Sequence, residues 1–377
     1  MMRVAVVIDT LKVGGAQRLI SAYAASAAAH GISPVVITLT PDGTPFLLDS
    51  IRTAGVKLIS LRAPSLFDLR RLRRLIQIFQ EEKVELVQTH LIYSNILGTL
   101  AAHFAGVPVI ATLHSTSVHG DWKSKILQQI QNVVLRFFAT RILAVGQMVA
   151  DLNQGNYGRR KVDVIPNGIP KPKFPQGQER ERMRREITAD GADGIIITVG
   201  RFSRAKGYED MIEALRLLQQ NASKPKLVMV GSGSTIDTVK NQIRELDLNQ
   251  SVILAGERED IPELLAMSDV YASSSHREGL PLAVLEAMMA GLPVVATAVG
   301  DIPNVVTQET GVVVPPHRPE LLAAALEDLL KDPKKRHSMG QAAYRRAMSE
   351  YSVDAWMKKH LALYHEVLSS RRQENSS

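Results

Sequence analysis

Residues 269–300, DVYASSSHREGLPLAVLEAMMAGLPVVATAVG, contain the strand, loop, helix and strand around which the fold is organised. Apolar, β-prone residues that end in a run of serines predict a strand over 270–273. A helix is predicted over 281–290, because proline suits the first helical position and glycine follows the end of the stretch. Residues 293–297 form the next buried strand. The loop therefore lies at the C-terminal end of a strand, where open parallel sheets bind their ligands.

Two carboxylates stand out within this stretch. Glu278 lies in the loop, and Glu286 follows eight positions later inside a helix made mainly of Leu, Ala, Val and Met. An unpaired buried charge costs several kcal/mol, so Glu286 needs a partner. One interpretation is an internal ion pair with an Arg or a Lys. The other is that both glutamates accept hydrogen bonds from hydroxyls of a ligand whose anionic part lies at the helix N-terminus. A sugar nucleotide has hydroxyls at both ends and a diphosphate between them.

The chain resembles the retaining GT-B glycosyltransferases of family 4, "glycosyl transferases group 1", through an E-x7-E signature made of Glu278-Gly-Leu-Pro, Glu286-Ala-Met and Gly291-Leu-Pro-Val-Val. The resemblance is strong over residues 164–316 and looser before them. It implies an α/β fold of the GT-B class, in which two doubly wound Rossmann-like domains face a central cleft. It also implies an enzyme that moves a sugar from a nucleotide-sugar, in this family usually a UDP-sugar, to an acceptor with retention at the anomeric carbon.

The resemblance assigns roles to residues of the loop and the helix. It implies that Glu278 holds hydroxyls of the donor sugar at the reaction centre, and that Glu286 holds the ribose of the nucleotide. Asp301 and Asn304 stand where the family more often has Gly and Glu, and these departures affect the local contacts of that loop. The residues after Glu278 that are also expected to contact the donor are Gly279, Leu280 and Pro281.

Length and composition limit the classes of protein to which the chain can belong. A chain of 377 residues suits two domains of about 150 to 200 residues each. An apolar fraction of 45% with mixed charges is typical of a globular protein, and no run approaches about 18 consecutive apolar residues. The N-terminal apolar run is short and predicts a first strand, not a signal peptide. With no cysteine the chain has no disulfide or thiolate chemistry, and a cytoplasmic location fits.

The stretch 171–177, rich in proline, polar and charged residues, predicts a linker between two domains. We expect residues 1–170 to form an N-terminal acceptor-binding domain and residues 171–354 a C-terminal domain that binds the nucleotide-sugar. By resemblance, the last segment, 355–377, packs back on the first domain. Strands and helices alternate in both halves, which predicts parallel, doubly wound sheets. The tail 371–377 is predicted to be disordered.

The first half offers glycines and histidines at the ends of its predicted strands. Gly14 and Gly15 follow the first strand, and adjacent glycines let a backbone approach a ligand, although such a pair is often only a turn. The resemblance places them near the donor phosphates or the acceptor. A lone histidine is more often structural, but the resemblance implies a catalytic role for His114, facing sugar and acceptor. His90 is the weaker candidate, and 115–121 is expected to form an acceptor loop.

Two cations, Arg201 and Lys206, flank the loop after the predicted strand 195–199. Taken alone, they fit a solvated turn. The resemblance to the family's G-R-x(n)-K-G element implies instead that they neutralise the donor diphosphate, whose charge grows in the transition state. Three further positions match stretches that lie near the base or the phosphates in the family: Gly231, Gly233 and Arg258.

The reaction is expected to need neither a metal nor another cofactor. No Asp-x-Asp motif occurs in the chain, so the metal-dependent GT-A arrangement lacks its ligands, and Arg201, Lys206 and a helix dipole would replace the metal. No carboxylate stands out as a nucleophile, which favours a same-face route assisted by the leaving phosphate.

Two alternative functions stay open. One is a UDP-sugar 2-epimerase of the same fold, whose family lacks this E-x7-E unit with the GR…KG loop; the other is a catalytically silent subunit that binds a nucleotide-sugar.

Charge is distributed unevenly along the chain. Residues 1–175 carry 20 Lys and Arg against 10 Asp and Glu, a balance of +10, whereas residues 176–377 carry 25 against 28, a balance of −3. Four arginines over 70–74 stand beside Leu and Ile at helical spacing, and Trp122 stands beside lysines. Such a face is often only solvated, and a basic cleft can also hold a soluble phosphorylated acceptor. We expect the first domain to lie on the anionic inner face of the membrane, where a lipid-linked acceptor or glycan precursor would be found. No nucleic-acid-binding motif is present, so nucleic acid is not an expected partner.

Overall fold

The computed structural model describes residues 1–12, 14–62, 68–114, 122–158, 160–175, 177–188, 192–221 and 223–374. The chain divides into two compact units. The first comprises Met1–Pro170 together with the residues from Ser352 onward, and the second comprises Lys171–Tyr351. The predicted boundaries were 170/171 and 354/355, so the structure places the second boundary three residues earlier.

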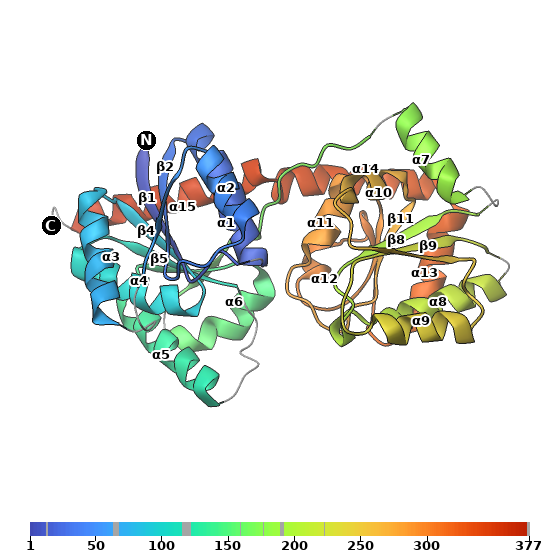
Figure 1. Cartoon of the computed structure of the whole chain (residues 1–377), viewed down its shortest axis with the longest axis horizontal. Coiled ribbons are helices and arrows are strands. Elements are labelled where there is room, and N and C mark those ends of the chain that lie inside the picture. The colour runs from blue at the N-terminus through green and yellow to red at the C-terminus, as the bar shows by residue number, and fades with distance from the viewer. Residues whose placement is uncertain are drawn as a thin grey trace. The chain divides into compact units, whose positions relative to one another are not determined.

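The first unit contains a seven-stranded parallel sheet in the order β3-β2-β1-β4-β5-β6-β7 (Figure 1). Its central strands are almost wholly buried, as expected for a parallel sheet covered on both faces. The strand order reverses between β1 and β4, so the loops after these two strands meet at the ligand-binding edge of the sheet. The strands are β1 (Met2–Ile8), β2 (Ile32–Thr38), β3 (Lys57–Ser60), β4 (Leu86–His90), β5 (Val109–Leu113), β6 (Arg141–Ala144) and β7 (Val162–Val164).

Helices cover both faces of this sheet. One face packs against α1 (Gly15–Ala27), α2 (Pro45–Thr53) and α15 (Val353–Glu374). The other face packs against α3 (Leu69–Glu81), α4 (Ile92–Ala105), α5 (Trp122–Phe138) and α6 (Gln147–Asn153). Two short 3-10 helices, η1 (Ala28–His30) and η2 (Gln154–Tyr157), follow α1 and α6.

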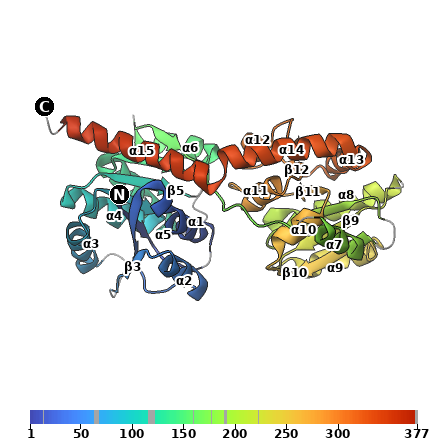
Figure 2. The same ribbon diagram turned by 90° about the horizontal axis from the view of Figure 1, so that it is seen from above.

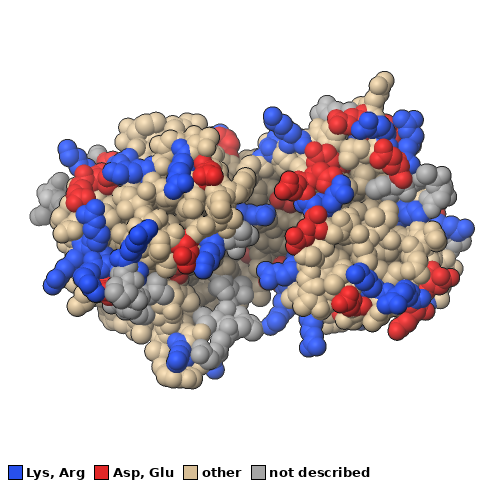
Figure 3. All heavy atoms as spheres, viewed as in Figure 1, with Lys and Arg blue, Asp and Glu red and all other residues tan. Residues whose placement is uncertain are grey.

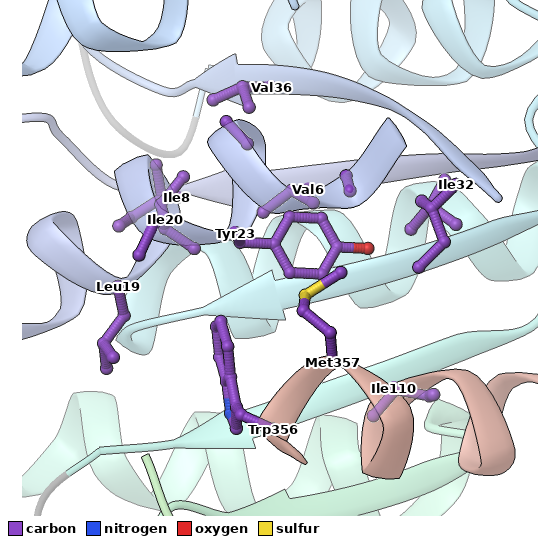
Figure 4. Packing of buried hydrophobic residues seen from close by; sticks show 14 of the residues in the cluster. Val6, Ile8, Leu19, Ile20, Tyr23, Ile32, Val36, Ile110, Trp356 and Met357 are labelled. Atoms are coloured by element: carbon purple, nitrogen blue, oxygen red, sulfur yellow. The ribbon is translucent and has the colours of Figure 1, made fainter. Parts of the chain in front are cut away.

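The last helix, α15, completes the core of the first unit and lies on its outer surface (Figure 2). Trp356 and Met357 pack against Tyr23 of α1, and the rings of Trp356 and Tyr23 meet edge to face at 6.0 Å (Figure 4). Farther along α15, the Tyr364 hydroxyl donates to the Tyr23 hydroxyl at 3.1 Å. The prediction of a disordered tail from residue 371 is wrong in part, because α15 continues to Glu374 and Arg371 donates to the carbonyl of Gly106. Residues 375–377 lie outside the described residues.

The second unit contains a six-stranded parallel sheet in the order β10-β9-β8-β11-β12-β13. Here the order reverses between β8 and β11, and the loops after these two strands are the ones that carry the predicted cations and Glu278. The predicted strands 195–199 and 270–273 are confirmed. The strands are β8 (Ile195–Val199), β9 (Lys226–Val230), β10 (Val252–Gly256), β11 (Val270–Ser273), β12 (Val294–Thr297) and β13 (Gly311–Val314).

The helices of the second unit also lie on both faces of its sheet. One face packs against α8 (Tyr208–Gln220), α9 (Ile236–Glu245) and α13 (Pro319–Lys331). On the other face lie α10 (Ile261–Met267) and α11 (Leu282–Met289), against which α7 (Gln178–Thr188) and α14 (Pro333–Glu350) pack, respectively. The shorter η3 (Arg204–Lys206) and α12 (Ile302–Val305) lie in loops. Both units are thus doubly wound and Rossmann-like, as predicted.

The predicted basic helix is α3, and its arginines differ in exposure. Basic side chains gather over α3 on the surface of the first unit (Figure 3). Arg71, however, is only 4% exposed, because it stands four residues before the buried Leu75 and so on the same helix face. Arg70 pairs with Asp68 at 2.9 Å, and Arg74 pairs with Glu81 at 3.0 Å. Of the four arginines, one is therefore buried and two are paired with carboxylates. In the described part of the chain, no helix is long and apolar enough to cross a membrane.

Candidate active site

The two loops at the reversal point of the second sheet are joined by an ion pair. The Nζ of Lys206, at the end of η3 after β8, donates to Oε1 of Glu278, in the loop after β11. The Oγ of Ser275 donates to the same carboxylate oxygen at 2.7 Å. The side chains of Lys206 and Glu278 are 23% and 13% exposed, so the pair is largely shielded but open on one side. This arrangement places one cation and one hydrogen-bond acceptor at the expected ligand-binding edge.

Backbone hydrogen bonds fix the two loops to each other. The carbonyl of Ala205 accepts from the N–H groups of His276, at 2.8 Å, and Arg277, at 3.2 Å. The Oγ of Ser274 donates to the carbonyl of Lys206 at 3.1 Å. The Lys206–Glu278 pair therefore rests on a framework of main-chain contacts, which limits the positions that its two side chains can take.

Two predicted glycines allow a third loop to approach the first. Gly231 and Gly233 follow β9 with φ of +134° and +151°, values that residues other than glycine rarely adopt. A Cβ on Gly231 would lie 2.1 Å from the carbonyl oxygen of Gly200, and one on Gly233 would lie 2.2 Å from that of Phe202. Glycine is therefore required at both positions for a structural reason, because the loops after β8 and β9 are in close contact there.

Buried tyrosines lie beneath the two glutamates. Burial raises the pKa of Tyr208, and the charge of Glu278 raises it further. Burial likewise raises the pKa of Tyr271, with smaller contributions from Tyr208, Glu278 and Glu286. Glu278 and the half-buried Glu286 therefore act on the same tyrosine, although they stand in different elements. The sequence did not single out either tyrosine or Ser275. Ser275 is near Glu278 in the chain itself, whereas the proximity of Tyr208 to the glutamates depends on the pairing of β8 with β11.

The turn after Glu278 is shaped by the loop that follows β12. Gly300 has φ of +58°, and a Cβ on it would lie 2.3 Å from the carbonyl oxygen of Gly279. That carbonyl accepts from the N–H of Asp301 at 3.0 Å, while the Asp301 carboxylate accepts from Asn304 at 3.2 Å. Asp301 and Asn304, the departures from the family pattern, thus contact each other. Pro281 is the N-cap residue of α11 in extended conformation, one position before its predicted place in the helix.

Two further cations of the second unit were predicted to contact the donor. Arg201 lies in the same loop after β8 as Lys206, is exposed and forms no ion pair within the described residues. Arg258 follows the edge strand β10 and binds Asp260 through two hydrogen bonds of 2.7 and 2.5 Å. That carboxylate raises the pKa of Arg258. Arg258 is thus already paired locally, whereas Arg201 presents its charge to solvent.

In the first unit the two predicted histidines touch. Nδ1 of His90 and Nε2 of His114 are 2.9 Å apart, a hydrogen bond in which one nitrogen donates and the other accepts. Burial lowers the pKa of His114 to about 4 and that of His90 well below its usual value. Both imidazoles are therefore neutral near pH 7. The predicted acceptor loop 115–121, which follows directly, lies outside the described residues.

The two glycines after β1 differ in their need to be glycine. Gly14 is the N-cap residue of α1 with an extended backbone, and a Cβ on it would lie 2.4 Å from Oε1 of the buried Gln17. Gly15 is exposed, with no atom near the position of a Cβ. Between β1 and β4, Asp9 accepts from the backbone N–H and hydroxyl of Ser94, at 2.6 and 2.7 Å, at the start of α4. Burial raises the pKa of Asp9. Asp9 could not be singled out from the sequence, because an acidic residue that follows a strand is not distinctive without its partner.

Comparison with known protein families decides the class. The model described as "Glycosyl transferases group 1" matches residues 179–346, and the one described as "Glycosyltransferase Family 4" matches residues 13–171. The chain is a GT-B glycosyltransferase of the family 4 type. The predictions of a GT-B fold and of a family 4 glycosyltransferase are thereby confirmed, whereas retention and metal independence stay predictions.

Relatives and solved structures agree with this assignment. An Escherichia coli UDP-Gal:alpha-D-GlcNAc-diphosphoundecaprenol alpha-1,3-galactosyltransferase is 29% identical over 67% of this chain and 68% of its own length. A D-inositol 3-phosphate glycosyltransferase of Kineococcus radiotolerans is 28% identical over 79% of this chain and 75% of its own. Among solved structures, Anabaena HepE in complex with UDP has a TM-score of 0.84 at 22% identity, over 98% of this chain and all of HepE. That structural likeness supports the fold.

This glycosyltransferase also has a large basic pocket away from the ion pair. A cavity of about 1130 Å³ lies between the linker, the end of α11 and α14 in the second unit. Its lining includes Lys171, Arg180, Arg336 and Arg345. None of the predicted site residues lines it, so its size does not make it the donor site.

Proposed function

We propose that this glycosyltransferase moves a sugar from a UDP-sugar to a lipid-linked or glycan-precursor acceptor, with retention at the anomeric carbon. The observation that carries the proposal is the Lys206–Glu278 pair at the strand-order reversal of the second unit. A diphosphate beside Lys206 would gain a cation, and sugar hydroxyls beside Glu278 would gain an acceptor. Structures of HepE with UDP and with UDP-glucose support a uridine donor, as does the UDP-Gal-dependent Escherichia coli relative.

In the proposed reaction the bond between the anomeric carbon and the diphosphate oxygen breaks on the face where the acceptor oxygen bonds. The acceptor proton passes to the departing phosphate oxygen, so no protein base is required. Lys206 and Arg201 stabilise the negative charge that grows on the leaving group. Glu278 orients the sugar through its hydroxyls, and Glu286 orients the ribose. His114, as a neutral imidazole, offers a hydrogen bond and not a positive charge. We propose that these side chains act without a metal.

The acceptor proposal draws on a surface of the first unit. Apolar side chains along α5 are 42% to 65% exposed: Trp122, Ile126, Ile130, Val133 and Phe137. Their spacing of three and four residues puts them on one helix face, and an exposed apolar face of this size marks an interaction surface. Lys123, whose Nζ lies 5.8 Å from the Trp122 ring, and Arg136 add positive charge on the same helix. A helix with apolar and basic residues suits an anionic membrane surface. We therefore assign membrane attachment to α5, with a smaller contribution from α3.

A donor panel followed by product analysis tests the reaction. Thermal shift with UDP-glucose, UDP-galactose, UDP-N-acetylglucosamine and GDP-mannose should single out one UDP-sugar. Mass spectrometry should then find that sugar added to a component of a membrane lipid extract, with UDP release that depends on the extract. Conversion of the donor to an epimer without acceptor would identify the 2-epimerase alternative. Donor binding without turnover under every acceptor condition would identify a silent subunit.

A further inference from the structure

A second group of polar side chains lies in the second unit, outside the proposed donor contacts. It consists of Asp210 in the first turn of α8, His276 in the loop after β11, and His317 in the loop between β13 and α13. Three segments that are distant in the chain thus contribute one potential metal ligand each. No member of this group was predicted to bind anything.

The three side chains point at one another. Nε2 of His276 lies 2.8 Å from Oδ2 of Asp210, and Nδ1 of His317 lies 3.9 Å from the same oxygen. The two imidazole rings lie 3.8 Å apart at an angle of 37°. All three ligand atoms are within 4.8 Å of one another. Ligands of a tetrahedral zinc ion, at about 2.0 to 2.2 Å from the metal, lie on the order of 3.3 Å apart. A small shift of the side chains therefore suffices to place all three on one ion.

The backbone holds two of the ligands close together. Gly207, directly before α8, has φ of +57°, and a Cβ there would lie 2.5 Å from Nε2 of His276. Because Gly207 lacks a Cβ, the first turn of α8 can approach the loop after β11. His317 has φ of +58°, a left-handed conformation that is uncommon outside glycine, and its side chain is 66% exposed. The group is thus open to solvent on the His317 side, where an ion can enter and a water ligand can bind.

We propose that Asp210, His276 and His317 bind a divalent transition-metal ion of the zinc class. Two imidazole nitrogens and one carboxylate oxygen match the preference of zinc, whereas magnesium and calcium prefer oxygen ligands alone. Asp210 supplies the negative charge of the site, whereas Glu320 in the first turn of α13 is already paired with Arg318.

The proposed ion is not needed for the sugar transfer described above. Its ligands are nevertheless near the residues that carry that proposal in sequence, since His276 stands two residues before Glu278 and Asp210 four residues after Lys206. A bound ion would cross-link the loops that bear this pair. The site would therefore act as a structural clasp on the second unit, in addition to the hydrogen bonds that Ala205 accepts.

Calorimetric titration of Zn²⁺ into the full-length, untagged, chelator-treated protein tests the site. We expect one Zn²⁺ per chain and no saturable Mg²⁺ binding under the same conditions. His317→Ala should weaken Zn²⁺ binding by at least about tenfold, and its exposure means that folding should be unaffected. His276→Ala should also weaken Zn²⁺ binding by at least about tenfold. His337→Ala is the matched control, because His337 is an exposed histidine of the same unit that hydrogen-bonds only to Gln341 among the described residues.

Co²⁺ provides a second measurement, because its visible absorption reports nitrogen and oxygen ligands directly. Wild type and His337→Ala should share a Co²⁺ spectrum that His317→Ala loses. The absence of stoichiometric Zn²⁺ binding to the wild-type protein would overturn the proposal. Equal Zn²⁺ affinity of wild type and His317→Ala would also overturn it, since the ion would then be bound elsewhere.

Discussion

Lys206 is the residue on which the proposed chemistry depends most. Lys206→Ala should lower kcat/KM by about 100-fold, because it removes a cation that stabilises the leaving diphosphate, an effect of about 3 kcal/mol. The fold should survive, since Ser275 and the main-chain bonds to Ala205 still hold the loop of Glu278. Steady-state kinetics with the identified donor measure the effect, and Lys240→Ala, at an exposed lysine, is the control. Near-wild-type turnover of Lys206→Ala would disprove the diphosphate assignment.

Glu286→Gln separates the two interpretations of the carboxylate on α11. If Glu286 holds the ribose, the variant should bind UDP more weakly, by about tenfold, with little change in melting temperature, since charged hydrogen bonds contribute about 1.5 to 3 kcal/mol. Isothermal titration with UDP and thermal unfolding measure the two quantities. A sharp drop in melting temperature with unchanged UDP affinity would instead make Glu286 a structural residue.

His114→Ala should lower turnover while leaving the affinity for UDP near that of the wild type. His114 lies in the first unit, whereas the proposed donor contacts lie in the second. Because its pKa is about 4, His114 should not produce an ionisation between pH 5 and 8 in the rate profile. UDP titration and a pH–rate profile test both statements. An equal loss of UDP affinity would place His114 at the nucleotide.

At the scale of elements, the sequence predicted best where the pattern was local. The strands 270–273 and 195–199 were placed correctly, because buried parallel strands are short apolar runs bounded by polar or glycine-containing loops. The start of α11 was displaced by one residue, since proline fits both the N-cap and the first helical position. The contact between Lys206 and Glu278, 72 residues apart, required knowing that β8 pairs with β11. Sequence periodicity carries no information on such pairing.

A buried histidine in the last helix, α15, should make the stability of the first unit depend on pH. His360 of α15 is 2% exposed, and burial lowers its pKa from 6.5 to about 4. The folded state therefore binds fewer protons than the unfolded state between these values. The contribution of neutral His360 to the free energy of unfolding is complete above pH 6.5. It is lost as the pH falls to about 4, which lowers the free energy of unfolding by about 3 kcal/mol.

Urea unfolding of the first unit, followed by the fluorescence of its two tryptophans at pH 7, 6 and 5, tests this dependence. The free energy of unfolding should fall steadily, and His360→Gln should reduce the slope by up to about 1.4 kcal/mol per pH unit. An unaltered slope in His360→Gln would show that His360 does not titrate with the predicted shift.

At the scale of the whole molecule, the uneven charge of the chain placed the expected membrane contact on the basic helix α3, whereas the surface that we propose is the apolar face of α5, also in the first unit. Helical spacing already places Arg71 on the face of Leu75, Ile78 and Phe79, which is buried. The apolar stripe of α5 could also have been found from its spacing. Its exposure could not, because an apolar helix face normally packs on the core. We therefore propose a membrane contact through an apolar helix face flanked by cations in place of an arginine cluster.

Sedimentation with liposomes tests the membrane attachment. Binding should require anionic lipid and weaken at high salt, because each cation near such a surface contributes about 1 kcal/mol. The combined change Ile126→Ser, Val133→Ser and Phe137→Ser should reduce binding by at least about tenfold, since three exposed apolar side chains then no longer enter the interface. Leu321→Ser, at an exposed apolar residue of the second unit, should bind as the wild type does. Equal binding to neutral and anionic vesicles would show that charge plays no part, and binding to neither would exclude the membrane as the site of the acceptor.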